Sequence, residues 1–314
     1  MATGAAQMRA VRYHRYGSPD VLAVERVPVP EPRKGEVLVK VFGTSVNPAE
    51  ALVRAGKFRL MSGFRFPKGI GEDFTGQVVA TGPGTSSALR DARVWGTQIG
   101  LNSATTAEYI RVKESLVAPA PTGHDLVELA ALPTVALTAR LALRLVGLSE
   151  GDRLLIVGAA GGVGTSAIQL ARAAGAIVTT LSGAANTELC RKLGAETALD
   201  YTRRPTGLAF DAIVDLYGAG LGGYRRLLAK DGRMATMAAK GLGYVLASRI
   251  RPGPSIRNGQ TRATRDELDA LAAHVERGEL RPVIDTIYPM ERITDAHRSV
   301  ETGHSRGKRV IRVA

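Results

Sequence analysis

One glycine-rich segment, from Arg153 to Ala171, constrains the fold more than any other part of the chain. Its letters are R-L-L-I-V-G-A-A-G-G-V-G-T-S-A-I-Q-L-A, so a G-x-x-G-x-x-G pattern separates an apolar run typical of a strand from an apolar-faced run typical of a helix. The strand, turn, helix and a second strand are expected at 153–157, 159–164, 165–174 and 176–181. This βαβ unit predicts a parallel sheet covered by helices.

The glycine turn has the composition of a dinucleotide-binding site. A pyrophosphate must come close to the backbone and to the start of the following helix, where unpaired N–H groups and the helix dipole favour an anion. A side chain at Gly161 would occupy that space, and Gly164 lets the helix lie against the strand. We therefore expect the cofactor to contact Gly158, Ala160, Gly161, Gly162, Val163 and Gly164.

The end of the second strand indicates which dinucleotide binds. An NAD-dependent enzyme usually places Asp or Glu there to bind the ribose hydroxyls. This chain has V-T-T-L-S-G-A-A-N at 178–186 and no acid before Glu188. Ser182 is suited to hydrogen-bond a 2′-phosphate, and Arg203 or Arg204 is expected nearby. The sequence therefore favours NADPH.

The rest of the chain divides into a β-rich part and an α/β part. The first hundred residues predict short strands broken by proline and glycine, and helical spacing begins at Asp125 and continues to Leu148. Beyond the glycine turn, strands are expected at 198–199, 212–216, 233–237 and 309–313, and helices at 187–193, 221–228, 265–277 and 293–302. The alternation indicates a doubly wound sheet.

Composition limits the class of protein. Apolar residues make up 45% of the chain and charged residues 23%, as in soluble globular proteins. The most apolar stretch, 129–148, carries Arg140 and Arg144, so we expect no membrane span and no membrane partner. A single cysteine, Cys190, excludes a disulfide framework and a cysteine-rich zinc site. No secretory signal is visible at 1–7, and we expect a cytoplasmic location.

The net charge of +13 has two interpretations. It describes an arginine-rich solvated surface, or it attracts a phosphorylated cofactor, an acidic protein or nucleic acid. Nucleic-acid binding requires a basic stripe with aromatic or motif support, and aromatic residues are only 5% of the chain. Nucleic acid is therefore not the expected partner.

Motifs along nearly the whole chain resemble the quinone oxidoreductase branch of the medium-chain dehydrogenase/reductase superfamily. They are M-R-A-V at 8–11, P-x-P-x-P-R-K-G-E-V-L-V-K-V at 28–41, S-V-N-P at 45–48, G-E-D-F-T-G-Q-V-V at 71–79, L-P-T-V-A-L-T-A at 132–139, A-A-G-G-V-G at 159–164 and G-K-R-V at 307–310. Their order and spacing are specific. The resemblance implies a GroES-like substrate domain at 1–122, completed by 255–314, a Rossmann NADP(H)-binding domain at 123–254, an active site in the cleft between them, and a homodimer.

The sequence departs from the zinc alcohol dehydrogenases of this superfamily. Those enzymes carry a cysteine ligand near Ser45, a histidine beside the position of Glu72, and a four-cysteine lobe, none of which is present here. We therefore expect no metal. Without a Lewis acid an alcohol is not readily ionised, whereas a conjugated alkene needs only a hydrogen bond to its carbonyl oxygen as charge develops. The expected activity is hydride transfer from NADPH to the conjugated double bond of a small enone, enoyl or quinone substrate.

The resemblance also implies site residues. Asn47, in S-V-N-P, is similar to an asparagine near the nicotinamide and is our first candidate for a substrate or oxyanion hydrogen-bond donor; alternatively it caps the following turn. Thr138 resembles a threonine that packs near the nicotinamide, unless it is a helix-interior residue. Ser182 and Tyr201 resemble residues beside the 2′-phosphate, and Lys308 matches a basic position that reaches the cofactor or lies in a solvated tail.

Two family residues are replaced in this chain. Phe58 stands where relatives often carry a tyrosine that can donate a proton, so water, Tyr13 and Lys57 remain as possible donors. Asn186 stands where a cofactor-binding lysine is usual, which weakens the case for NADPH over NADH unless the nearby arginines take the place of the lysine.

Two other functions remain open at this point. The branch contains trans-acting enoyl reductases that work on carrier-protein-bound intermediates, and a basic surface is suited to an acidic acyl carrier protein. Some relatives instead bind NADPH and serve as non-catalytic RNA-binding or structural proteins. Salt-dependent RNA binding would support the second alternative, and NADPH consumption with a quinone or enone would oppose it.

Overall fold

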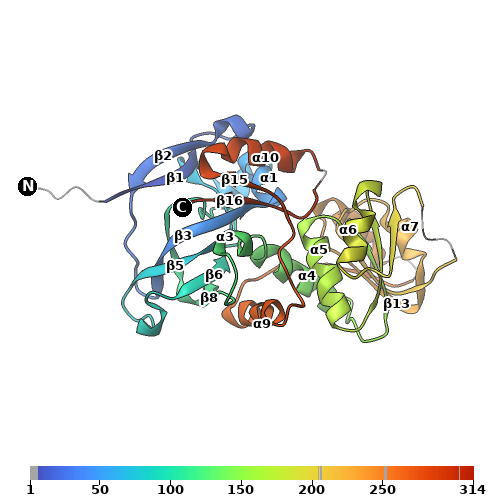
Figure 1. Ribbon diagram of the computed structural model, residues 1–314. Coiled ribbons are helices and arrows are strands. Elements are labelled where there is room, and N and C mark those ends of the chain that lie inside the picture. Colours follow the sequence, from blue (N-terminus) through green and yellow to red (C-terminus); the bar gives the residue numbers. More distant parts are fainter. Residues whose placement is uncertain (1–5, 204, 206, 251–252, 304) are drawn as a thin grey trace, which may run out of the picture. The chain divides into compact units, whose positions relative to one another are not determined.

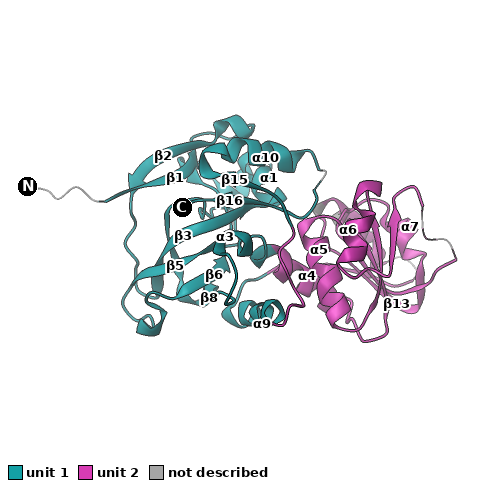
Figure 2. Cartoon of the chain, in the orientation of Figure 1, with its two compact units in different colours: residues 1–134, 262–276, 284–314 teal, residues 135–261, 277–283 magenta. Residues whose placement is uncertain are grey.

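The computed structural model describes residues 6–203, 205, 207–250, 253–303 and 305–314. They form two compact units (Figure 2). Unit 1 comprises residues up to 134 together with 262–276 and 284–314, and unit 2 comprises 135–261 and 277–283. The domain limits expected from the sequence are 122/123 and 254/255. The two units divide after residues 134 and 261, which is twelve and seven residues later.

Unit 1 is built on two sheets (Figure 1). The larger has the order β15-β16-β3-β5-β6-β8, with β7 also paired to β3, and the smaller has the order β2-β1-β4. The strands are β1 (Gln7–Tyr13), β2 (Ala23–Pro28), β3 (Glu36–Val46), β4 (Lys68–Gly69), β5 (Asp73–Thr81), β6 (Arg93–Thr97), β7 (Tyr109–Lys113), β8 (Val117–Pro119), β15 (Ile284–Pro289) and β16 (Lys308–Arg312). The predicted β-rich first part and the closing strand are confirmed.

Strand β3 organises unit 1. Val37, Val39 and Val41 alternate along it, and all three are fully buried in the core between the sheets. Burying a valine stabilises a fold by about 1.5–3 kcal/mol, so this alternation fixes which face of β3 points inward. A side chain at Gly76 on β5 would lie 2.0 Å from the carbonyl oxygen of Lys40, so glycine is required for the two strands to pair this closely.

The helices of unit 1 are α1 (Pro48–Arg54), α2 (Arg59–Ser62), α3 (Leu126–Leu129), α9 (Arg265–Glu276) and α10 (Ile293–Glu301). Helix α10 buries Ile293, Ala296, His297 and Val300, the spacing of one helix face, and lies beside α1 (Figure 1). The segment after α3 packs its small side chains against Val310 of β16. This contact explains why residues 123–134 group with unit 1. The sequence alone suggests that they belong to the Rossmann domain.

Unit 2 is a six-stranded sheet in which every neighbouring pair is parallel. Its order, β11-β10-β9-β12-β13-β14, is that of a doubly wound dinucleotide-binding sheet. The strands are β9 (Arg153–Val157), β10 (Ile177–Ser182), β11 (Thr197–Asp200), β12 (Phe210–Asp215), β13 (Leu228–Thr236) and β14 (Ile256–Arg257). The helices are α4 (Pro133–Leu145), α5 (Gly162–Ala173), α6 (Thr187–Lys192), α7 (Leu221–Arg225) and α8 (Leu242–Ser248).

The strand–helix alternation predicted for unit 2 is confirmed. Helix α5 begins three residues before the predicted start, and β14 and α8 were not predicted. Strand β9 is apolar at four consecutive residues, 154–157, all fully buried, because helices cover both faces of a parallel sheet. Among the described residues, no helix has both the length and the apolar character needed to span a bilayer.

Candidate active site

The predicted site residues fall into two groups, one in each unit. Unit 2 holds the glycine turn with Thr138, Ser182 and Tyr201, and unit 1 holds Asn47 and Lys308.

The glycine turn joins β9 to α5 at the carboxyl end of the parallel sheet. Gly158 has φ of +82°, a left-handed conformation that favours glycine, and its N–H donates to the carbonyl oxygen of Leu181 at 3.0 Å. Gly161 is the N-cap of α5, and the N–H of Thr165 donates to its carbonyl oxygen at 2.8 Å. The amides of residues 162–164, which precede this bond, have no partner within the helix and are suited to bind an anion.

Two glycines of the turn are required for different reasons. A Cβ at Gly164 would lie 2.4 Å from the carbonyl oxygen of Ala159, so this glycine lets α5 pack on the end of β9. A Cβ at Gly161 would meet only one atom within 4 Å, the carbonyl oxygen of Gly158 at 3.9 Å. Among the described residues, no steric contact requires glycine at 161, so the space beside the first amides of α5 is open.

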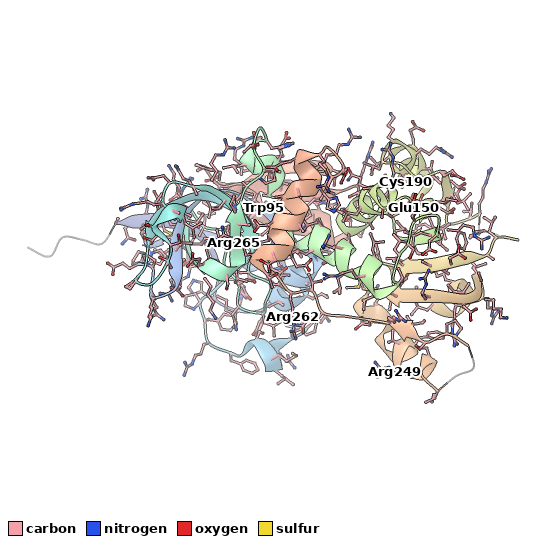
Figure 3. The ribbon with its side chains drawn as sticks, turned by 90° about the horizontal axis from the view of Figure 1, so that it is seen from below. Trp95, Glu150, Cys190, Arg249, Arg262 and Arg265 are labelled. Carbon is pink, nitrogen blue, oxygen red and sulfur yellow. The ribbon has the colours of Figure 1, made fainter. Side chains whose placement is uncertain are left out.

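The end of β10 carries a neutral residue. Ser182 ends the strand, is 1% exposed, and pairs in register with Asp200 of β11. Its hydroxyl donates to the carbonyl oxygen of Gly183 at 3.3 Å and accepts a weak bond from the thiol of Cys190, labelled in Figure 3. Burial raises the pKa of the Cys190 thiol, which makes it a structural residue.

Tyr201 follows β11 beside Ser182. Its N–H donates to the carbonyl oxygen of Ser182 at 3.2 Å, and its ring lies 6.1 Å from that of Tyr217, centroid to centroid. Both rings are partly exposed, at 43% and 56%. Arg203 is exposed after them, and Arg204 lies outside the described residues. Asn186 ends a short turn at 184–186 and precedes α6.

Thr138 lies on α4 and is half-buried. Its hydroxyl is 3.0 Å from the hydroxyl of Thr261. This hydrogen bond joins side chains 123 residues apart and ties α4 to the last segment of unit 2 before residue 262. A place for Thr138 near the nicotinamide stays a prediction.

Asp215 is a residue of this region that the sequence analysis missed. It ends β12, is fully buried, and accepts from the hydroxyl of Thr236 at 2.6 Å and from the N–H of Gly218 at 2.9 Å. Burial raises the pKa of this carboxyl. Its place at the carboxyl end of a predicted strand is the one signal that would have drawn attention to it.

In unit 1, Asn47 is the centre of a buried polar cluster. Its Nδ2 donates to Oε1 of Glu50 at 2.8 Å and to Oδ2 of Asp73 at 3.0 Å, and its Oδ1 accepts from Nζ of Lys308. Because an ammonium group only donates, the Lys308 contact fixes the orientation of the amide. Asn47 is also the N-cap residue of α1, which is the alternative role expected from the sequence. Both N–H groups and the oxygen of its side-chain amide already have hydrogen-bond partners in the cluster.

Asp73 links this cluster to three other segments. Its carboxylate accepts from the hydroxyl of Ser45 at 2.5 Å and from the N–H of Thr134 at 2.7 Å, and it lies 3.6 Å from Nζ of Lys308. Asp73 belongs to the motif G-E-D-F-T-G-Q-V-V at 71–79, and the sequence alone predicts no role for it. The side chain of Lys308 is 5% exposed, and it contacts these groups of unit 1.

The cluster carries more negative than positive groups. Glu50, Glu72 and Asp73 are all buried, and Lys308 is the one cation that the structure places against them in the described residues. Burial, followed by the charge of Asp73, raises the pKa of Glu72 to about 7. Burial and the charge of Glu72 raise the pKa of Glu50 well above its ordinary value. Near neutral pH, this cluster therefore holds at least part of a proton.

The proton donors left open by Phe58 differ in exposure. Phe58 precedes α2 and is half-buried. Tyr13 is 2% exposed and packs edge-on against Phe66, and burial raises the pKa of its hydroxyl to about 12. Lys57 is exposed. Tyr13 is thus poorly suited to exchange protons with solvent, whereas the side chain of Lys57 is in contact with solvent.

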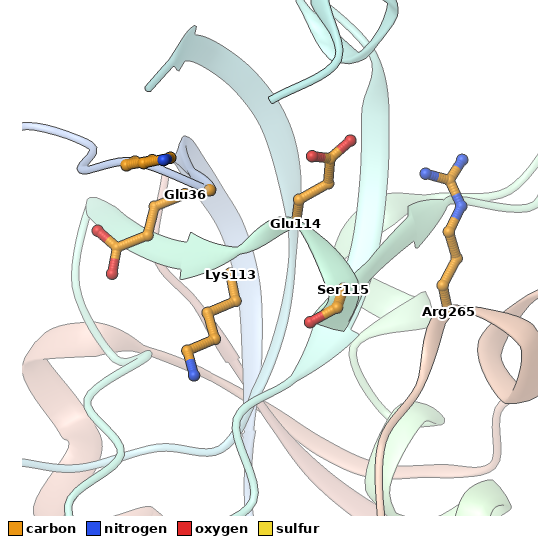
Figure 4. A pocket seen from close by; sticks show the side chains of 7 residues that line it. Glu36, Lys113, Glu114, Ser115 and Arg265 are labelled. Carbon is orange, nitrogen blue, oxygen red and sulfur yellow. The ribbon is translucent and has the colours of Figure 1, made fainter. Parts of the chain in front are cut away.

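Two hollows on unit 1 do not include any of these residues. One, of about 630 Å³, is lined by Lys34, Glu36, Lys113, Glu114, Ser115 and Arg265 (Figure 4). Glu36 lies 3.7 Å from Arg111, and the carboxylate of Glu114 accepts from the N–H of Ser86. The mixed charges favour neither an anion nor a cation. In the described part of the chain, no three His, Cys, Asp or Glu side chains are grouped so as to hold a metal ion.

Comparisons with known proteins agree with this architecture. The family model described as "Alcohol dehydrogenase GroES-like domain" matches residues 33–122, and the one described as "Zinc-binding dehydrogenase" matches residues 193–311. Among solved structures, the quinone oxidoreductase from Coxiella burnetii has a TM-score of 0.92 at 29% identity, covering 98% of this chain and 100% of that one. The GroES-like and Rossmann architecture predicted from the sequence is confirmed.

Curated relatives match most of the length of the chain. The 2-methylene-furan-3-one reductase of Solanum lycopersicum is 33% identical over 98% of this chain and 79% of its own length. The NADPH-dependent alkenal/one oxidoreductase of Arabidopsis thaliana is 32% identical over 97% of this chain and 79% of its own length. The chain belongs to the quinone oxidoreductase branch of the medium-chain dehydrogenase/reductase superfamily, a family of nicotinamide-dependent oxidoreductases.

Proposed function

We propose that this protein is an NADPH-dependent reductase of the conjugated carbon–carbon double bond in small enones or quinones, and that it works without a metal. The observation that carries the proposal is the glycine turn between β9 and α5, with its open space at Gly161. The names of the relatives, which include an alkenal/one oxidoreductase and quinone oxidoreductases, support the substrate class.

NADPH would supply the hydride. Residues 158–164 bind its pyrophosphate through backbone amides, and Ser182 and Tyr201 lie at the carboxyl ends of β10 and β11, where the adenosine end binds in this fold. The support for NADPH over NADH is that β10 ends on Ser182, where an NAD-dependent enzyme usually carries Asp or Glu to bind the ribose hydroxyls.

Asn47 is the proposed residue for orienting the substrate carbonyl, with one restriction. Both N–H groups of its amide are already donated to Glu50 and Asp73. A substrate oxygen therefore binds Asn47 only by displacing one of these carboxylates. Lys308 is proposed to keep the amide in the donating orientation, in addition to or in place of the cofactor contact expected from the sequence.

Water, acting directly or through the exposed Lys57, is the proposed source of the second hydrogen. Hydride addition to the β-carbon leaves an electron pair on the carbonyl oxygen and α-carbon, and a proton must then be added. Phe58 has no hydroxyl group, and Tyr13 is buried with a raised pKa. Reaction in deuterated water should place one deuterium on the α-carbon and none on the β-carbon.

The test is a spectrophotometric assay of NADPH oxidation with simple quinones, enones and enoyl thioesters, together with metal analysis of the purified protein. Turnover of an enone or quinone by metal-free protein is the expected result. Turnover that requires stoichiometric zinc, or an absence of NADPH binding, contradicts the proposal.

The net charge of +13 favours a second candidate, a trans-acting enoyl reductase that receives its substrate on an acidic acyl carrier protein. A higher kcat/KM for a carrier-bound enoyl group than for the same group on a small thiol would identify it. The same charge keeps a non-catalytic RNA-binding role as the alternative of another class, which salt-dependent RNA binding without NADPH oxidation would support. We further propose a homodimer in the cytoplasm, to be tested by sedimentation equilibrium and cell fractionation.

A further inference from the structure

The segment from α1 to β4 exposes an unusual number of large apolar side chains. Leu60 is 86% exposed, Met61 73%, Phe64 64% and Leu52 41%. The other large apolar side chains exposed in the described residues are spread singly or in pairs over the chain. We call Leu52, Leu60, Met61 and Phe64 the apolar tip. Clustered exposure of this kind marks an interaction surface more often than isolated exposed residues do.

The apolar tip stands on an anchored loop. The hydroxyl of Tyr16 lies 2.8 Å from that of Ser62 and donates to the carbonyl oxygen of Gly63. The buried ammonium of Lys68 donates to the carbonyl oxygen of Ser62 at 2.6 Å and to Oδ1 of Asn102 at 3.1 Å. These bonds hold the backbone of residues 62–63 while the neighbouring apolar side chains point to solvent, so the exposure is built into the fold.

The chain segment that carries the apolar tip is cationic. Residues 51–71 contain five cationic side chains and no acid. Of these, Lys57, Arg59 and Arg65 are exposed, and none of the three forms an ion pair with a described residue. The light-blue ribbon of this segment reaches the lower edge of unit 1 in Figure 3. The surface therefore combines protruding Leu, Met and Phe with a collar of free cations.

Exposed apolar side chains together with unpaired cations favour one kind of binding partner over others. A second copy of the chain would bring Arg59 and Arg65 against the same cations, a repulsive arrangement in a two-fold interface. A protein partner would need a groove for the protruding side chains, matched by acids. An anionic lipid surface meets both requirements without a fixed shape, because its acyl boundary accepts apolar side chains and its headgroups attract Lys and Arg.

We propose that the apolar tip and its cationic collar form a docking surface for membranes that contain anionic lipids. The tip inserts Leu60, Met61 and Phe64 into the headgroup boundary, and Lys57, Arg59 and Arg65 contact lipid phosphates. The chain then binds a bilayer peripherally, without a spanning helix. The expectation of no membrane partner, drawn from the absence of an apolar span, did not consider side-chain exposure, and this proposal replaces it.

The test measures co-sedimentation of the full chain with vesicles of phosphatidylcholine alone or mixed with phosphatidylglycerol. Binding is expected only to the mixed vesicles and should weaken as salt is raised. Leu60→Ser combined with Phe64→Ser should lower the partition coefficient by at least about tenfold. In a Phe64→Trp variant, indole emission should shift to the blue on adding mixed vesicles, because the side chain leaves water.

Matched controls separate this site from general effects. Leu246→Ser with Ile250→Ser removes two apolar side chains of unit 2 that are 56% and 89% exposed, and it should leave binding unchanged. Arg59→Glu with Arg65→Glu should abolish the preference for anionic lipid, whereas Arg33→Glu with Arg262→Glu, an equal change of charge at exposed positions of unit 1, should weaken it only slightly. Unchanged thermal unfolding shows that each variant is folded.

Three results would overturn the proposal. Equal co-sedimentation with both vesicle types would show that binding does not depend on anionic lipid. Self-association that is lost in the Leu60→Ser, Phe64→Ser variant would assign the surface to a second copy. Failure to bind vesicles, together with tip-dependent binding of a purified acyl carrier protein, would assign it to an acidic protein.

Discussion

The amide nitrogen of Asn47 lies 3.0 Å from the carboxylate of Asp73, in the interior of unit 1 and 26 residues away along the chain. The carboxylate of Asp73 also accepts hydrogen bonds from the hydroxyl of Ser45 and the backbone N–H of Thr134, and it lies beside the ammonium group of Lys308. One carboxylate therefore joins β3, β5, β16 and the start of α4. This arrangement makes Asp73 the residue on which the geometry of the cluster depends.

Asp73→Asn should therefore disrupt unit 1. The substitution keeps the size of the side chain but leaves the buried ammonium of Lys308 facing two carboxyls that bind protons readily. Removing one partner of a buried ion pair costs about 3–5 kcal/mol, and we expect a loss of that order in the free energy of unfolding in urea. Glu31→Gln, at an exposed residue, is the control and should change stability by less than about 0.5 kcal/mol. Equal effects of the two substitutions would contradict the role given to Asp73.

Glu72 should make the stability of the protein fall as pH rises toward neutral. Its pKa is about 7 in the folded protein and near the ordinary value of 4.5 when unfolded, so the folded state binds the proton more tightly. Its contribution is fully present below about pH 4.5 and is lost as pH rises to about 7, with a slope of up to about 1.4 kcal/mol per pH unit. Glu72→Gln, which cannot ionise, should remove this slope and be more stable than the natural chain at about pH 8. Urea unfolding across this range checks the sign, and an unchanged slope would refute the assignment.

His297 should act in the opposite direction. It is fully buried on α10, and neither ring nitrogen has a hydrogen-bond partner in the described structure. Burial, with a smaller effect of the Arg54 charge, lowers its pKa to about 3, so the unfolded chain binds the proton first. The free energy of unfolding is therefore unaffected by His297 above about pH 6.5, and it decreases as the pH falls from there toward 3. His297→Leu should flatten this acid limb without loss of stability at neutral pH, because a leucine leaves no unpaired nitrogen. His274→Leu, at a residue that is not fully buried, is the comparison.

The two glycines of the turn should separate stability from binding. Gly164→Ala places a methyl group 2.4 Å from the carbonyl oxygen of Ala159 and should lower the melting temperature. Gly161→Ala meets no protein atom closer than 3.9 Å, so it should leave the melting temperature unchanged while weakening NADPH binding about tenfold or more. Thermal unfolding and calorimetry on both variants provide the measurement. A destabilised Gly161→Ala variant would show that the space at this glycine is not reserved for a ligand.

The sequence predicts local features of this fold better than distant contacts. Strand β9 is predicted to the residue, and the helix after the glycine turn to within three residues, because glycine spacing and an apolar run act within a few positions. The contact of Asn47 with Lys308 joins residues 261 positions apart and depends on the pairing of β16 with β3, which no local pattern encodes. The predicted and observed domain limits differ for the same reason, because residues 123–134 pack against Val310, which is distant in the sequence. Side-chain exposure, on which the apolar tip depends, likewise follows only from the complete fold.

The central claim is that a phosphorylated dinucleotide binds the amides at Gly161. Titration calorimetry of the purified, metal-free protein with NADPH and then with NADH tests it most directly. The account predicts one site per chain, tighter binding of NADPH than of NADH, and loss of that binding in Gly161→Val. Absence of heat with either dinucleotide, or equal binding by the natural chain and Gly161→Val, would contradict it.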